Sequence, residues 1–122
     1  MQIAFWIVAA VTALFALAVG TLKVVRSTDG LVGIGMHWTE NFSSAQIKSI
    51  GVLEIIAAVG IIVPALTRIA PLLSPIAALC WLALLIGAIV VHTRRKESAV
   101  PAIMASLLAI ATAILGFTTL LG

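Results

Sequence analysis

One acidic residue, Glu54, lies inside a long apolar stretch of the sequence, SIGVLEIIAAVGIIVPAL at positions 49–66. A lone carboxylate in a segment of membrane-spanning length is energetically costly, and such residues usually mark a binding or proton-transfer site. Its neighbours at helical spacing are Ile50, Gly51, Ala57 and Ala58. Because small residues line the packing faces of membrane helices, we expect the Glu54 carboxylate to point into a helix bundle.

A carboxylate inside a bundle needs a cation, a hydrogen-bonded protonated form or a watery pocket. Lys23 is one candidate partner, because it lies three residues after Gly20 and continues the same helix face. His92 is the other, and a histidine there could relay protons or bind a ligand. The alternatives stay open: Glu54 could only clasp helices, Lys23 could snorkel to the membrane surface, and His92 could mark the membrane boundary.

Further polar and aromatic residues could complete a site. His37, Trp38, Glu40 and Asn41 lie together before the second apolar stretch. Trp38 alone would be an interfacial anchor, but if this segment folds back over the bundle, the group forms a lid above Glu54. Trp81 needs a partner for its indole N–H, so it either lines the same cavity or packs in the core. The histidines and carboxylates lack the close spacing of a metal site, so we expect no metal.

The composition indicates that lipid surrounds these residues. Of 122 residues, 63% are hydrophobic and 9% are charged, whereas soluble domains carry about 25% charged residues. The seven basic residues are too few and too scattered for a nucleic-acid surface. Cys80 is the only cysteine, so no intramolecular disulfide can form, and we expect it to be a small packing residue.

Four apolar stretches predict an all-α fold, an integral membrane four-helix bundle in a single transmembrane domain, because backbone in lipid must bond internally. The predicted helices cover residues 3–22, 44–63, 70–92 and 99–121. A capping box from Ser43 to Gln46 should start the second helix, which should end before Pro64, and Pro75 should kink the third helix if that helix begins before it. The connection 23–43 has an apolar middle too short to span, so it should be interfacial or re-entrant.

Small residues at helical spacing predict the faces along which three of these helices pack. They are Ala9, Ala13, Ala16 and Gly20; Ala77, Cys80, Ala83 and Gly87; and Ala102, Ala105, Ala109, Ala113 and Gly116. The remaining Leu, Ile and Val faces should meet lipid. Similar small faces also join membrane chains, so a homodimer is one expectation.

The basic residues predict an orientation in the plasma membrane. Six lie in or beside the first and third connections: Lys23, Arg26, Lys48, Arg94, Arg95 and Lys96. The second connection carries only Arg68. The positive-inside rule therefore places the first and third connections in the cytoplasm and both termini outside. The first apolar stretch lacks the basic start of a signal peptide and is too long for one, so we expect an uncleaved helix.

With these residues placed, the sequence resembles the DoxX-like family of small four-helix membrane proteins. The matching pieces are Gly20-Thr21-Leu22-Lys23, Gly51-Val52-Leu53-Glu54, Ile62-Val63-Pro64 and Gly87-Ala88-Ile89-Val90-Val91-His92, followed by Arg94-Arg95-Lys96. The resemblance covers nearly the whole chain and puts Lys23, Glu54 and His92 at the family's characteristic polar positions. It implies an accessory role in thiosulfate–quinone oxidation or thiol-stress complexes, or chaperone-like assembly of other membrane proteins. Since the chain has no cysteine pair, a redox role would act through a partner or a bound quinone.

Three functions fit these observations. The favoured one is a module that binds a small apolar molecule or a quinone, with a membrane redox protein as candidate partner. Its candidate ligand-binding residues are Glu54, Lys23, His92, Trp38, Asn41 and Trp81. The second is an assembly or scaffold protein in which the polar groups only fasten the bundle. A small proton-coupled exporter ranks last, because the glutamate is in the second helix and few aromatic residues could line a cation path. No familiar catalytic motif indicates an enzyme.

Overall fold

The structure, a computed structural model, describes residues 2–120. Four long helices dominate it: α1 (Gln2–Val25), α3 (Ser44–Thr67), α4 (Leu73–Arg94) and α5 (Val100–Leu120). Each is long and apolar enough to cross a membrane, which confirms the predicted all-α membrane bundle. The predicted end of the last helix, Leu121, lies outside the described residues.

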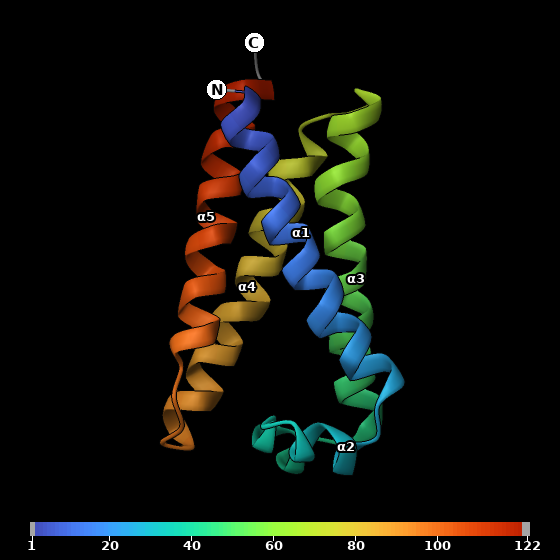
Figure 1. Cartoon of the computed structure of the whole chain (residues 1–122), viewed down its shortest axis with the longest axis vertical. Coiled ribbons are helices and arrows are strands. Elements are labelled where there is room, and N and C mark those ends of the chain that lie inside the picture. The colour runs from blue at the N-terminus through green and yellow to red at the C-terminus, as the bar shows by residue number, and fades with distance from the viewer. Residues whose placement is uncertain (1, 121–122) are drawn as a thin grey trace.

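The bundle consists of two helix pairs that separate toward one end. Helix α1 packs mainly along α3, and α4 packs along α5 and almost as extensively along α3. Near the termini the pairs lie close together, whereas at the opposite end they spread into a wedge (Figure 1). The buried side chains between them are mostly small, with the larger Phe5, Ile61 and Trp81 filling the space. The wedge follows from the angle at which the helices cross, and its wide end is where the candidate site lies.

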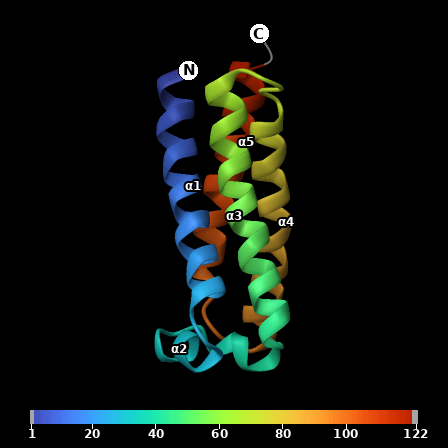
Figure 2. The same cartoon turned by 90° about the vertical axis from the view of Figure 1, so that its right-hand side faces the viewer.

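The connection from α1 to α3 folds across the wide end of the wedge (Figures 1 and 2). It contains a short helix α2 (Thr28–Gly33) and a 3-10 helix η1 (His37–Asn41). The Ser27 side chain caps α2 by accepting a hydrogen bond from the backbone of Gly30. Leu31 and Thr39 are buried, so this segment is a folded cover and not an open loop.

Helix α3 begins as the capping-box signal predicts but ends later than expected. The Ser43 side chain accepts a hydrogen bond from the Gln46 backbone, and the Gln46 side chain accepts one from the Ser43 backbone. The helix then runs through Pro64 to Thr67, so the prediction that it ends at residue 63 is wrong. If the helix ended at Pro64, several backbone N–H and C=O groups would lose their partners in lipid, whereas a proline inside the helix removes one backbone hydrogen bond. The hydroxyl of Ser74 also donates to the carbonyl of Ile61, near the carbonyls that the proline ring displaces.

Helix α4 begins at Leu73, which places Pro75 in its first turn. A proline there removes no intrahelical hydrogen bond, so the expected kink has no cause. Residues 70–72, predicted to be helical, instead form the turn from α3. Pro75 is buried against α5, where a Cβ at Gly116 would lie 2.9 Å from the proline ring.

The predicted small-residue faces are confirmed in α1 and α5, whose stripes are buried throughout. In α4 the prediction is wrong: Ala77 is half-buried, and Cys80, Ala83 and Gly87 are exposed. The buried residues of α4 are Ser74, Pro75, Ala78, Trp81 and Leu85. Burying the large indole of Trp81 with a hydrogen bond stabilises the bundle more than burying a stripe of small residues would. Helix α4 therefore turns its Trp81 face inward. Cys80 consequently lies on the outer surface and not in the core.

Candidate functional site

Glu54 occupies the interior of the bundle, as its small neighbours predict, and it is 2% exposed. Helix α1 continues past its predicted end at residue 22, so Lys23 lies in the last helical turn on the buried face. The Lys23 ammonium donates a hydrogen bond to Glu54 Oε1 and forms an ion pair with that carboxylate. The structure thus joins α1 to α3 through a buried charge pair.

Trp81 supplies the second contact to the carboxylate. Its indole Nε1 donates to Glu54 Oε2 over 2.8 Å, and its side chain is fully buried. Both carboxylate oxygens therefore have partners, one on α1 and one on α4. A carboxylate with two donors of this kind is well stabilised in a low-dielectric interior. The three helices meet at this one side chain.

Replacing Trp81 with phenylalanine is expected to lower the free energy of unfolding by about 1.5–3 kcal/mol. Phenylalanine keeps most of the buried ring but removes the donor to Glu54, and hydrogen bonds to charged groups are the stronger ones. Unfolding in mixed micelles, followed by circular dichroism, measures the change. The control is Trp6→Phe, because Trp6 is only half-buried and contacts Phe5 through its ring. Equal losses in the two variants would show that the hydrogen bond contributes little.

A close helix contact lies directly beside the charge pair. A Cβ added to Gly20 would lie 2.7 Å from the Gly51 carbonyl oxygen, and one added to Gly51 would lie 2.7 Å from the Gly20 carbonyl oxygen. Real Cβ atoms essentially never come within 3.0 Å of another heavy atom, so a side chain at either position would force the two helices apart. Glycine at both positions lets α1 and α3 come near enough for Lys23 to reach Glu54 while staying buried.

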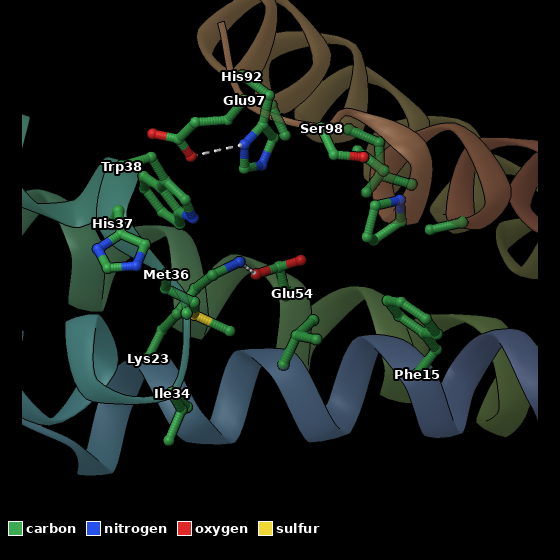
Figure 3. A pocket seen from close by; sticks show the side chains of 17 residues that line it. Phe15, Lys23, Ile34, Met36, His37, Trp38, Glu54, His92, Glu97 and Ser98 are labelled. Carbon is green, nitrogen blue, oxygen red and sulfur yellow. Dashed lines mark hydrogen bonds and ion pairs between the residues drawn. The ribbon is translucent and has the colours of Figure 1, made fainter. Parts of the chain in front are cut away.

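Two cavities flank the Lys23–Glu54 pair, one of about 500 Å³ and one of about 280 Å³. The larger cavity lies between α1 and the α4–α5 pair, beneath residues 34–38 of the cover. The smaller one lies between α3 and α4, beneath Trp38 and Phe42. Both are lined by Lys23, Trp38, Glu54, Leu85, Ala88 and His92. Figure 3 shows His92 and Glu97 on the wall opposite Lys23 and Glu54.

Trp38 is the part of the cover that reaches the charge pair. Its ring centroid is 5.4 Å from Lys23 Nζ, 6.4 Å from the His92 ring and 5.5 Å from the Phe42 ring. The ammonium over the indole is a cation–π contact. Trp38 also lines both cavities, so it is the residue of the cover that borders both sides of the pair.

His92 lies in the last turn of α4, and within residues 2–120 no hydrogen bond or ion pair joins it to Lys23 or Glu54. After it the chain turns back: Lys96 has a left-handed backbone with φ of 59°, and the Glu97 N–H bonds the His92 carbonyl over 2.9 Å. This Schellman ending brings the Glu97 side chain to His92. Glu97 Oε2 lies 3.5 Å from His92 Nδ1, within ion-pair range, but that buried nitrogen makes no hydrogen bond within residues 2–120.

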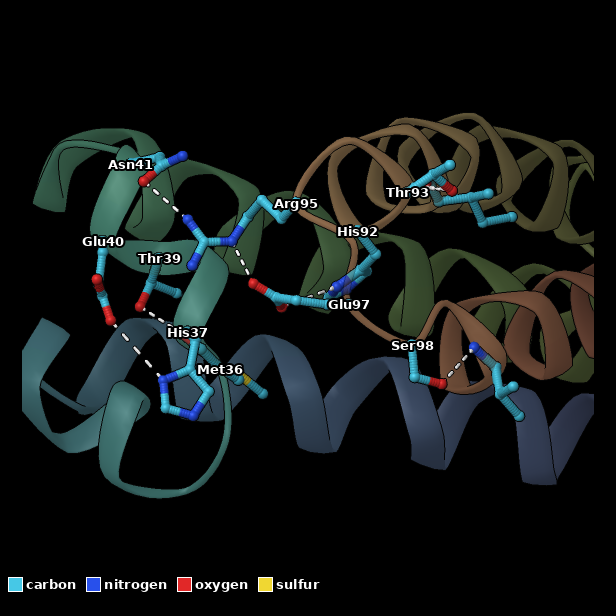
Figure 4. Close-up of polar contacts among 12 residues, drawn as sticks. Met36, His37, Thr39, Glu40, Asn41, His92, Thr93, Arg95, Glu97 and Ser98 are labelled. Carbon is cyan, nitrogen blue, oxygen red and sulfur yellow. Dashed lines mark hydrogen bonds and ion pairs between the residues drawn. The ribbon is translucent and has the colours of Figure 1, made fainter.

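Glu97 is a site residue that the sequence did not reveal. The only signal was an acidic residue inside the basic run HTRRKES, five positions after a histidine. Arg95 donates through Nε to Glu97 and through Nη1 to Asn41 Oδ1, the latter over 2.8 Å (Figure 4). We call Asn41, Arg95 and Glu97 the latch, because they tie η1 to the end of α4. Asn41 is exposed and lines neither cavity, so it lies apart from the other predicted site residues.

The latch is expected to loosen in acid. The hydrogen bond from Arg95 is the main cause that holds the pKa of the Glu97 carboxyl below its ordinary 4.5, with His92 adding to it and burial opposing it. Because the folded state has the lower pKa, its stabilisation is complete above pH 4.5 and disappears as the pH falls through the folded value. The indole N–H signal of Trp38 in NMR spectra should report the change. Glu97→Gln should remove this response, and an unchanged response in that variant would contradict the assignment.

The remaining predicted lid residues lie toward the outside. His37 lines the larger cavity, but its side chain is 58% exposed and lies 3.7 Å from the carboxylate of Glu40, which is also exposed. No group of three potential metal ligands gathers among residues 2–120. Four of the predicted site residues therefore line the cavities: Lys23, Glu54, Trp38 and His92. Trp81 lines neither of them and instead donates a hydrogen bond to Glu54. The part of these residues in ligand binding stays a prediction.

Comparison with known proteins finds one family whose members resemble this chain. The model of the DoxX-like family matches residues 7–115, which cover most of each long helix and all the residues around the two cavities. No curated protein and no solved structure matches the sequence. The match covers far more than half of the chain.

Proposed function

This chain belongs to the DoxX-like family, and from that membership and the cavities beside Glu54 we propose that it is a membrane module that binds a small apolar molecule. A quinone is the candidate ligand, and a redox complex in the membrane is the candidate partner. The observation that carries the proposal is the cavity of about 500 Å³ at the wide end of the wedge. Sites for small molecules are mostly apolar concavities of about 300–1,000 Å³ with a few polar groups.

The lining of this cavity supports the proposal. Most of it is aliphatic or aromatic, and the few polar groups belong to the cover, the charge pair and the end of α4. The arrangement gives a ligand apolar walls for affinity and a small number of hydrogen-bonding groups for orientation. The helices around it meet lipid on their outer faces, so an apolar ligand could reach the site from the bilayer.

A cavity-filling variant tests this function. Purified protein in nanodiscs is titrated with decylbenzoquinone, and quenching of tryptophan fluorescence is measured. We expect saturable quenching in the wild type and at least about tenfold weaker binding in Ala88→Phe, because Ala88 lines both cavities. Ala4→Phe is the matched control, since Ala4 is exposed on α1 and lines neither cavity. Equal binding in all three proteins would contradict a site in these cavities.

A scaffold function is the second candidate, and one observation favours it. Both oxygens of Glu54 already accept hydrogen bonds from the protein, so the carboxylate fastens three helices without any ligand. In this case the protein would co-purify with a stable membrane partner or as a homodimer, and cavity-filling variants would leave that association unchanged. The same observation argues against a proton-coupled exporter, whose carboxylate must be free to exchange protons and substrate.

We further propose that the cover and the α4–α5 connection face the cytoplasm of the plasma membrane, with both termini outside. Six basic residues lie at the end of the bundle that carries the cover, and Arg68 lies at the other end (Figure 1). Labelling by an impermeant thiol reagent in intact cells tests this orientation in a Cys80→Ser background. A cysteine in place of Thr67 should react, and one in place of Glu40 should not.

A further inference from the structure

We propose that the larger cavity selects an amphiphile with an uncharged, carbonyl-bearing head, held between Lys23 and His92, and with its apolar tail directed toward the middle of the bundle. This inference rests on the proposed function, because it specifies which apolar molecules the site accepts. Three features of the described residues carry it: the polarity of the cavity along its length, the balance of charge around it, and the hydrogen-bonding groups left without partners.

The cavity changes from polar to apolar along the helix axes. Its wide end carries Lys23, His92 and Glu97, whereas Phe15, Leu85 and Ala105 line its deeper part. On α1 Phe15 lies eight positions from Lys23, and on α4 Leu85 lies seven positions from His92, which correspond to a rise of about 10–12 Å along each helix. Figure 3 shows the same separation, with Phe15 far from Trp38 and His37. An amphiphile would therefore place its head beneath the cover and its tail between α1 and α5.

The charges around the head position cancel. Lys23 pairs with Glu54, and Glu97 pairs with Arg95. His37, which borders the mouth, lies beside Glu40. A carboxylate head would lie beside Glu54 and Glu97 without an unpaired cation, and an ammonium head would lie beside Lys23. Burying an unpaired charge is costly, so the cavity favours a head without one.

The groups that lack partners would donate to such a head. An ammonium has three N–H donors, and Lys23 Nζ uses one of them on a protein acceptor, Glu54, within residues 2–120. The His92 ring lines the cavity with Nδ1 turned toward Glu97, and its other nitrogen, Nε2, points toward the cavity (Figure 3) and makes no hydrogen bond in the same part of the chain. The Glu54 oxygens, by contrast, both accept hydrogen bonds already. A carbonyl oxygen would accept from Lys23 while the head lies against the indole of Trp38.

A competition series with one tail and four heads tests this selection. The wild-type protein in nanodiscs binds decylbenzoquinone, and methyl decanoate, decanoate and decyltrimethylammonium are added as competitors at about pH 8, where a fatty acid is ionised. We expect methyl decanoate to displace the quinone, and the two charged compounds to need at least about tenfold higher concentrations. Displacement by decanoate or by the ammonium compound at the concentration that suffices for methyl decanoate would overturn the inference and leave the proposed function standing. If none of the four compounds binds, the proposed function fails with it.

A variant of the histidine tests the head position. We expect His92→Phe to weaken quinone and ester binding by about five- to tenfold, because it removes one hydrogen-bonding group beside the head. Thr93→Val is the matched control, since Thr93 is exposed and, among the described residues, its hydroxyl bonds only the Ile89 carbonyl. Unchanged binding in His92→Phe, with the fold intact by circular dichroism, would show that the head lies elsewhere. Ala105→Leu separately shortens the deep part of the cavity, and it should weaken decyl compounds more than their ethyl analogues.

Discussion

Replacing Glu54 with glutamine is expected to lower the free energy of unfolding by about 3–5 kcal/mol, because it leaves the Lys23 ammonium buried without a counter-charge. Lys23 is 9% exposed and Glu54 is 2% exposed, so water screens the pair little. Glutamine still offers an oxygen to the indole of Trp81, so the loss reports the ion pair and not the second hydrogen bond. Unfolding in mixed micelles, followed by circular dichroism, gives the value.

A double variant separates the charge from the packing. Lys23→Met combined with Glu54→Gln should recover most of the lost stability, because neither charge then remains unpaired. The matched control is Glu40→Gln. The Glu40 side chain is 52% exposed and lies 3.7 Å from His37, so its loss should cost less than about 1 kcal/mol. Wild-type stability in Glu54→Gln would show that Lys23 reaches water or another acceptor once the carboxylate is gone.

Replacing Gly51 with alanine is the second change with a large expected effect, a loss of about 1–3 kcal/mol. The new methyl group would lie 2.7 Å from the Gly20 carbonyl oxygen and 2.9 Å from Lys23 Cβ. Backbone cannot move aside as a flexible side chain can, so α1 and α3 must separate. The separation would also lengthen the Lys23–Glu54 contact, and quinone binding should weaken together with stability.

Gly87→Ala is the control for this prediction. Gly87 lies in α4 and lines the smaller cavity, but a Cβ there meets no atom within 4 Å. The change should leave stability unchanged or raise it by up to about 1 kcal/mol, because alanine favours the helix more than glycine does. Equal effects at Gly51 and Gly87 would show that helix propensity, and not the close approach of two backbones, controls stability at position 51.

The glycine contact between α1 and α3 and the buried Lys23–Glu54 pair depend on each other. The glycine contact lets α1 approach α3, the approach brings Lys23 to Glu54, and the indole of Trp81 fixes the other carboxylate oxygen. The wedge between the helix pairs then remains open on both sides of a neutralised pair. The same residues could therefore stabilise the bundle and border a binding site, and the experiments above separate these roles.

The sequence alone determined the features that depend on local chemistry. Its apolar content and the length of each apolar stretch require membrane helices, since backbone in lipid must bond internally. The capping box of α3 is a contact among four consecutive residues, so it could be predicted from their types. The inward direction of Glu54 followed from its neighbours within one helix, and its burial confirms it.

Only the tertiary structure decided how the helices turn toward one another. Helix α4 has small residues on one face and Trp81 on the next, and the position of Glu54 on α3 selects the Trp81 face. The tertiary structure also decided the positions of Glu97 and Asn41. Glu97 reaches His92 through a left-handed turn at Lys96, and Asn41 bonds Arg95 away from the cavities. These outcomes depend on groups that are distant in the sequence or on a backbone turn that side-chain types do not specify. Local patterns therefore fix where each helix lies along the chain, and packing fixes which of its faces meets the site.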